Sequence, residues 1–319
     1  MVDEISLKMK KVRDIELNGS EAVNKLVKQM RNSGGFMAKN FGEAVDILED
    51  MIKDASCIKF LSFPAAPIAT GLRGVLRKLV QDSLIDVVIT ASGTLDHDLA
   101  RVWGTYYEGD FELNDEELFK RNIHRLGNVL VPRDSYGTLL EEKLQPFFKD
   151  LYNEGIREIS STELSARLGA LVNSKSSILY WAKRNNIPVF VPGLTDGAVG
   201  SQLWLFSQNH RDFKINLLKD ETYLSDIVFD TKNSGALMIG GGISKHHTLW
   251  WNQFKGGLDF AVNITSAVEW DGSLSGAAVR EAISWGKVNP KARKVTVRGE
   301  ATTMLPFIVE ALLNRLNKS

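Results

Sequence analysis

From about residue 55 onward, short apolar runs alternate with longer segments in which apolar residues recur at helical spacing. Most of the short runs are continuously apolar, which is typical of strands that are covered on both faces of a sheet. The pattern predicts strands at 57–63, 86–92, 188–193, 235–240, 259–265 and 294–299.

Helical periodicity fills most of the intervals between these runs. It predicts helices near 66–82, 138–153, 175–185, 198–208, 214–232, 243–255 and 301–316. Strands that alternate with helices at this spacing form a parallel sheet, because each crossover helix returns the chain to the same end of the sheet. We therefore predict an α/β fold with a Rossmann-like, mostly parallel sheet and helices on both faces. The stretch 103–135 is the least regular, and we expect it to lie beside the sheet.

Upstream of the first strand, the chain has helical periodicity alone. Helices are predicted at 21–31, where Ser20 could act as the N-cap, and at 42–53. We divide the chain into an N-terminal helical extension, residues 1–54, and a single α/β catalytic domain, residues 55–319.

The composition narrows the possible partners. Lys plus Arg and Asp plus Glu both number 39 among 319 residues, so no basic field indicates binding to nucleic acid. No apolar run approaches the length of about 20 residues that a membrane span needs, and the charged N-terminus lacks the apolar core of a signal peptide. Cys57 is the one cysteine, which excludes an intrachain disulfide and fits a reduced, cytoplasmic setting.

Candidate chemistry follows the predicted strands. Ligands of open α/β sheets bind beyond the carboxyl ends of the strands. Four predicted strands are followed by small residues together with acids or histidines, in 91-ASGTLDHD-98, 193-GLTDGAVGSQ-202, 240-GGGISKHH-247 and 266-SAVEWDGSLSG-276. These segments predict a ligand site along one edge of the sheet.

Several residues in these segments have both a structural and a functional interpretation. The glycine run 240–242 is either a tight turn or an approach for phosphate to a helix N-terminus. His246 could face the cleft as a base, and His247 would then point about 100° away from it. Asp196 and Asp271 could cap turns, or they could bind ribose hydroxyls or a cationic substrate. The sequence has no His-x-x-x-His pair or cysteine cluster, so we expect no metal.

The segment 284-SWGK-287 puts a lysine beside a tryptophan. In the simpler interpretation, Trp285 belongs to a core or an interface and Lys287 extends past it to solvent. In the functional interpretation, the lysine lies in an apolar setting, where desolvation favours the neutral amine that forms imines. The indole could also hold a substrate ammonium by cation–π attraction.

Four segments together resemble deoxyhypusine synthase: 194-LTDG-197, 240-GGGISKHH-247, 269-EWDGSLSGA-277 and 281-EAISWGK-287. Weaker likeness runs through 86-DVVITASG-93, 126-LGNVLVP-132 and 179-LYWAKRNNIPVF-190, so the resemblance covers nearly everything after about residue 55. It implies an enzyme that uses NAD to oxidise spermidine, releases 1,3-diaminopropane, and carries the aminobutyl group as an imine on a lysine. The group then passes to a lysine of initiation factor 5A. The resemblance also implies a homotetramer with active sites at dimer interfaces.

The same resemblance implies roles for individual residues. Lys287 is the covalent carrier, His246 the general base, Trp285 a wall of the polyamine channel and Glu281 an acid within it. Positions that match cofactor contacts are Gly240, Gly241, Gly242, Asp196, Asp271, Ser275, Ala267 and Glu300, the last where the family usually has an aspartate.

Three positions depart from the family pattern in residues that recognise the polyamine. Ser201 and Leu274 stand where acids are usual, and His97 stands where a glutamate is usual, although Asp96 and Asp98 flank it and could compensate. The loss of up to three carboxylates should weaken the capture of a fully charged polyamine. Two alternatives therefore remain: a homospermidine-synthase-like or agmatine-using transferase that acts on a small amine, and an NAD-binding protein without transferase activity.

Overall fold

Six parallel strands form the central sheet of the computed structural model, which describes residues 11–317. Their order across the sheet is β11-β10-β9-β1-β2-β7, and each strand runs parallel to its neighbours. The strands are β1 (Cys57–Phe63), β2 (Val87–Thr90), β7 (Val189–Phe190), β9 (Asn233–Ile239), β10 (Leu258–Thr265) and β11 (Val288–Arg298). These are the six strands that the apolar runs predict, and the predicted parallel α/β fold is confirmed.

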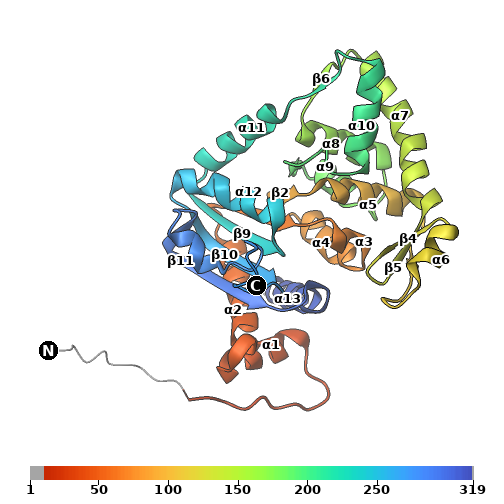
Figure 1. Cartoon of the computed structure of the whole chain (residues 1–319). Coiled ribbons are helices and arrows are strands. Elements are labelled where there is room, and N and C mark those ends of the chain that lie inside the picture. Colours follow the sequence, from red (N-terminus) through yellow and green to blue (C-terminus); the bar gives the residue numbers. More distant parts are fainter. Residues whose placement is uncertain (1–10, 318–319) are drawn as a thin grey trace.

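The sheet is covered on both faces, as its continuously apolar strands require. The helices that pack on the sheet or on the helices beside it are α2 (Phe36–Lys53), α3 (Ala66–Ala69), α4 (Leu72–Gln81), α5 (Ser92–Trp103), α7 (Gly137–Asn153), α8 (Ser161–Val172), α9 (Ile178–Arg184), α10 (Ala198–Asn209), α11 (Leu217–Phe229), α12 (Gly242–Asn252) and α13 (Ala301–Leu316) (Figure 1). Neighbouring residues of one strand enter different cores: Phe60 packs with α11 and α12, whereas Leu61 packs with α2, α4 and α13 on the other face.

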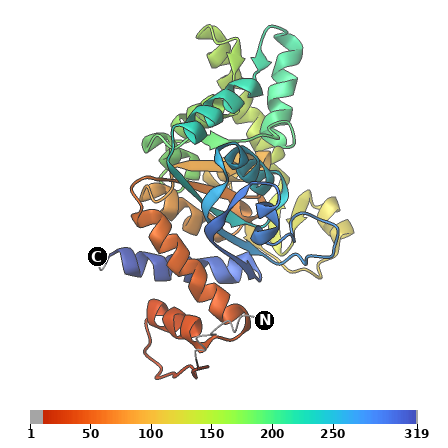
Figure 2. The same ribbon diagram turned by 90° about the vertical axis from the view of Figure 1, so that its left-hand side faces the viewer.

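The described part of the N-terminal extension contains two helices, preceded by residues 11–22 without regular structure. Helix α1 (Val23–Ser33) lies beyond α2, at the end of the molecule opposite α7 and α10 (Figures 1 and 2). Helix α2 buries Phe41, Val45, Leu48 and Met51 in the same core that covers the sheet. The predicted Ser20 cap is wrong, because α1 starts two residues later, after Ala22, and has no side-chain cap. Residues 1–10 of the predicted extension lie outside the described residues.

The stretch predicted as irregular has structure of its own. It forms an antiparallel sheet of β3 (Tyr107–Glu108), β5 (Val129–Pro132) and β4 (Ile123–Leu126), with the short helix α6 (Asp115–Lys120) beside it. A two-stranded pair of β6 (Glu158–Ile159) and β8 (Lys214–Ile215) was not predicted.

A larger correction concerns the segment after β2. The strand was predicted to reach residue 92 and no helix was predicted after it, but β2 ends at Thr90 and α5 begins at Ser92. Leu95 and Leu99, one turn apart, are fully buried and attach this helix to the core. Asp96 and His97 are therefore helical residues. No helix within residues 11–317 combines the length and apolarity needed to traverse a lipid bilayer.

Candidate active site

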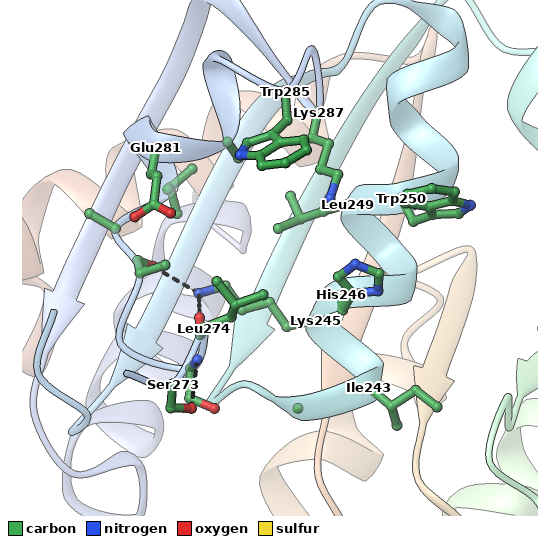
Figure 3. Close-up of a pocket in the computed structure, with 16 residues that line it drawn as sticks. Ile243, Lys245, His246, Leu249, Trp250, Ser273, Leu274, Glu281, Trp285 and Lys287 are labelled. Carbon is green, nitrogen blue, oxygen red and sulfur yellow. Dashed lines mark hydrogen bonds between the residues drawn. The ribbon is translucent and has the colours of Figure 1, made fainter. Parts of the chain in front are cut away.

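A pocket of about 630 Å³ lies along α12, from the carboxyl end of β9 at Gly242 to the amino end of β11 at Lys287 (Figure 3). Its walls come from α12, from residues 273–282, and from the segment 285–287 that leads into β11. The pocket is lined by four residues that the sequence analysis assigned to one site: Lys287, His246, Glu281 and Trp285. The structure thus brings together side chains from positions 246 to 287.

The side chain of Lys287 lies between two indole rings. Its Nζ atom is 5.3 Å from the ring centroid of Trp285 and 5.3 Å from that of Trp250, which comes from α12 on the other wall. Among the described residues, no hydrogen bond or ion pair engages this amine. A primary amine that points into a pocket without an acidic partner is free to react with a carbonyl or iminium carbon.

His246 and His247 diverge, as helix geometry requires. The His246 ring faces the pocket and stacks on Trp250, with ring centroids 5.8 Å apart. Desolvation, and then the charge of Lys287, lower the pKa of His246 below its ordinary value. A neutral imidazole is therefore available near neutral pH and can accept a proton. The His247 Nε2 atom instead lies 3.4 Å from Glu221, on α11.

Two cations hold the loop that forms the pocket floor. Lys245 is buried and donates to the carbonyl oxygens of Ala277, at 2.9 Å, and Leu274, at 3.4 Å. Burial lowers the pKa of Lys245 to about 8, against the opposing charge of Glu281. From the end of β11, Arg298 donates to the carbonyl oxygens of Ala267 and Gly276 and to the Glu269 carboxylate. The loop is thus fixed through its backbone carbonyls from both sides.

The glycine run forms the turn from β9 into α12. A Cβ atom on Gly241 would lie 2.4 Å from the Cβ atom of Ser275, so any larger residue would push the 273–277 loop away. Helix α12 begins at Gly242 with no side-chain cap and no acid in its first turn. Among the described residues, no heavy atom lies within 4 Å of a Cβ atom built on Gly242. The N–H groups of this helix start are therefore open to an anionic ligand.

Comparison with known proteins agrees with the family resemblance of the sequence. The model of the deoxyhypusine synthase family matches residues 25–312. The chain belongs to the deoxyhypusine synthase family. A probable deoxyhypusine synthase of Thermoplasma volcanium is 53% identical over 98% of this chain and 100% of that protein. Another, from Ignicoccus hospitalis, is 44% identical over 97% of both chains.

The fold agrees with that of a solved protein. A crystal structure from Entamoeba histolytica, described as a deoxyhypusine synthase, covers 96% of this chain and 97% of its own, with a TM-score of 0.68 and 21% identity. At 21% identity, this similarity shows the fold alone. The curated relatives mark the chain as a transferase.

The two candidate substrate-binding residues on α5, Asp96 and His97, lie outside the pocket. Asp96 accepts hydrogen bonds from the backbone N–H groups of Ala198 and Val199, at 2.8 and 2.7 Å, and from the Tyr136 hydroxyl at 2.9 Å. It therefore caps α10, and burial raises its pKa. His97 is hydrogen-bonded to the Tyr106 hydroxyl at 2.8 Å, and burial lowers its pKa to about 4.

The positions predicted to contact a cofactor divide into two groups. Gly242 and Ser275 line the pocket, and Gly240 and Gly241 precede the same helix. The others lie at turns or helix starts: Asp196 is exposed just before α10, the Asp271 carboxylate accepts from Ser273 N, the Ala267 carbonyl accepts from Arg298, and the Glu300 carboxylate caps α13.

The three departures from the family pattern also differ in position. Leu274 lines the pocket and is 67% exposed, so an apolar side chain stands where the family usually has an acid. Ser201 lies on α10 and His97 on α5, and neither lines the pocket.

Sequence reasoning assigned no role to three residues that line or support this pocket. Trp250 stands four residues after His246 on a predicted helix, so helical spacing could have put both on one face. No sequence pattern indicated a role for Lys245 or Arg298, because only the tertiary structure reveals that both side chains reach the loop 266–277.

Proposed function

We propose that this chain is a deoxyhypusine synthase. It transfers the aminobutyl group of spermidine, with NAD as cofactor, through an imine on Lys287 to a lysine of initiation factor 5A. The observation that carries the proposal is the Lys287 amine, which points into an aromatic pocket beside His246 and has no acidic partner among the described residues.

The residues around the start of α12 fit a dinucleotide. The uncapped N–H groups from Gly242 onward suit a pyrophosphate, and the close approach of Gly241 to Ser275 keeps the 273–277 loop beside them. Asp196 and Asp271 are exposed acids that could accept from ribose hydroxyls. A dinucleotide held by these groups would supply the hydride acceptor for the donor amine and the hydride donor for the final reduction, so the reaction has no net oxidation.

The chain's own groups account for the transfer. The Lys287 amine adds to the oxidised carbon and 1,3-diaminopropane leaves, which gives the enzyme imine. The acceptor lysine then adds to the same carbon, and Lys287 leaves as the free amine. His246, whose lowered pKa keeps its ring neutral, accepts and returns the protons of these steps. With its mouth covered by a partner subunit, the apolar pocket would exclude the water that otherwise hydrolyses the imine.

One observation favours a second candidate. Among the described residues that line the pocket, Glu281 is the one carboxylate. Spermidine carries three charges, so a less charged donor such as agmatine, or a small amine as acceptor, would also suit this pocket. A transferase that uses agmatine or forms homospermidine is therefore the alternative.

We also propose a homotetramer whose sites lie at dimer interfaces. Trp285 and Leu274 are 68% and 67% exposed at the pocket mouth, and apolar side chains so placed favour a covering surface. Light scattering on the purified protein would give the mass of the assembly, and a monomer would contradict this part of the proposal.

The decisive experiment is trapping of the enzyme imine. The enzyme is mixed with NAD and spermidine, reduced with borohydride, and mapped by peptide mass. We expect an aminobutyl group on Lys287, none in Lys287→Arg, and full labelling of the exposed control Lys291→Arg. A label with agmatine but not spermidine would support the alternative. Bound NAD without a label from any amine would indicate a protein without transferase activity.

A further inference from the structure

We infer that Trp250 determines donor specificity, by forming with Trp285 an aromatic clamp that binds the cationic amine donor. This inference rests on the proposed function and extends it to the way in which the substrate is held. Nothing in the sequence pattern assigned a role to Trp250.

The clamp is formed by two elements on opposite walls. Trp285 belongs to the turn before β11, Trp250 belongs to α12, and the Lys287 Nζ atom is equally far from both ring centroids, at 5.3 Å (Figure 3). A cation within about 6 Å of an indole centroid is attracted by the ring, and tryptophan is the best partner. The Lys287 amine therefore occupies a position where a substrate ammonium would also be stabilised.

Trp250 is held in this orientation by its neighbours along the chain. His246 and Trp250 are four residues apart on one face of α12, and Phe254 follows in the 3-10 turn Gln253–Lys255. The His246 ring is stacked on Trp250, and the Phe254 ring meets Trp250 edge to face, with centroids 6.1 Å apart. The indole is thus preorganised, although 43% of the residue is exposed.

The ionic groups of the pocket cannot hold a polyamine by themselves. The pocket lining contains one acid, Glu281, and two lysines, Lys245 and Lys287. A second or third positive charge of the substrate therefore has no carboxylate to pair with among the described lining residues. The remaining lining is mostly apolar, including Leu249, Ala278 and Ala282. This arrangement suits an aliphatic amine with one ammonium on Glu281, an alkyl chain along the apolar wall, and the reacting nitrogen between the two indoles.

The test compares Trp250→Phe and Trp250→Leu with Trp251→Phe. Trp251 is the matched control, because it is the next residue of α12 but donates to Glu221, at 2.6 Å, and does not line the pocket. Spermidine binding is measured by calorimetry with and without NAD, and transfer is measured separately as kcat and KM. We expect the Kd to rise about threefold in Trp250→Phe and about 10- to 30-fold in Trp250→Leu, with no change in Trp251→Phe. In the transfer assay KM should rise in parallel, whereas kcat changes by less than about threefold.

The outcomes separate this inference from the proposed function. Unchanged spermidine affinity in Trp250→Leu overturns the clamp, whatever the wild type transfers. A collapse of kcat with unchanged affinity also overturns it, because Trp250 would then act through His246. Weaker binding in Trp250→Leu, combined with a wild type that transfers nothing, supports the clamp and refutes the synthase. A wild type that binds no spermidine refutes both.

Discussion

Two halves of the central sheet have titratable residues beside them, and they use them in opposite ways. Beside β9, β10 and β11, Lys287 and His246 face an open pocket along α12. Beyond β2 and β7, Asp96 and His97 are enclosed by α10 and by tyrosines, with every hydrogen-bonding partner supplied by the protein itself. The residue types are similar, but Asp96 and His97 are engaged within the protein, whereas Lys287 and His246 are available to a ligand.

The difference lies in what surrounds each half. The uncapped start of α12 leaves its N–H groups open, whereas the N-terminal N–H groups of α10 are occupied by the Asp96 carboxylate. A free helix N-terminus can bind an anion, and an occupied one stabilises the fold instead. Substitutions in the open half should therefore change activity, and those in the closed half should change stability.

The largest effect is expected in the open half, from His246→Gln. Removal of a general base typically costs about 10²- to 10⁴-fold in rate. The free energy of unfolding should stay within about 0.5 kcal/mol of wild type, because the ring is exposed to the pocket. Steady-state kinetics and urea denaturation would check both. Because the pKa of His246 is lowered, the acid limb of kcat against pH should fall below the ordinary histidine range. Activity close to wild type in His246→Gln would refute its role as base.

Lys245 lies beneath the open pocket, and its burial should make the stability of the protein depend on pH. Its pKa is 10.5 in the unfolded chain and about 8 in the folded protein. Between these values the unfolded state binds more protons, so this group makes the protein more stable as pH rises from 8 to 10.5. The gain should reach about 3 kcal/mol. Denaturation at several pH values should reveal it in wild type but not in Lys245→Met. Parallel curves for the two proteins would contradict the assignment.

Elements whose structure has a local cause could be predicted from the sequence, whereas those that depend on tertiary packing could not. The six strands of the sheet were predictable, because doubly covered strands must be continuously apolar. Helix α5 was missed because Ser92, Gly93 and Asp96 are typical of turns, while the packing of Leu95 and Leu99 decides the structure.

The candidate site divides in a similar way. The motif around 281–287 predicted Lys287, Trp285 and Glu281, and the structure brings them into one pocket, although their roles stay predictions. The contact of Lys287 with Trp250 joins two elements far apart in the chain, and no local pattern encodes it. Asp96 and His97 are reactive residue types that the sequence shows, but their enclosure depends on Tyr136, Tyr106 and α10, which no local pattern connects with them.

In the closed half, His97 should affect stability at acid pH. Its pKa is 6.5 in the unfolded chain and about 4 in the folded protein, mainly through burial and then through the charge of Arg101. As pH falls from 6.5 to 4, the unfolded chain takes up the proton first, so stability falls in this window. We expect wild type to lose up to about 3 kcal/mol more than His97→Gln across it. The exposed control His124→Gln should follow wild type. Equal losses in wild type and His97→Gln would show that His97 is not enclosed in solution.

The smallest effect is expected from Tyr136→Phe, which removes one of the three donors to the Asp96 carboxylate. Hydrogen bonds to charged groups contribute about 1.5–3 kcal/mol, so the free energy of unfolding should fall by about 2 kcal/mol. Tyr107→Phe, at an exposed tyrosine, should change it by less than about 0.5 kcal/mol. Because two backbone donors still hold Asp96, α10 should remain capped, and spermidine binding in the open half should be unchanged. A loss of spermidine affinity in Tyr136→Phe would mean that the two halves are coupled, and the comparison between them would fail.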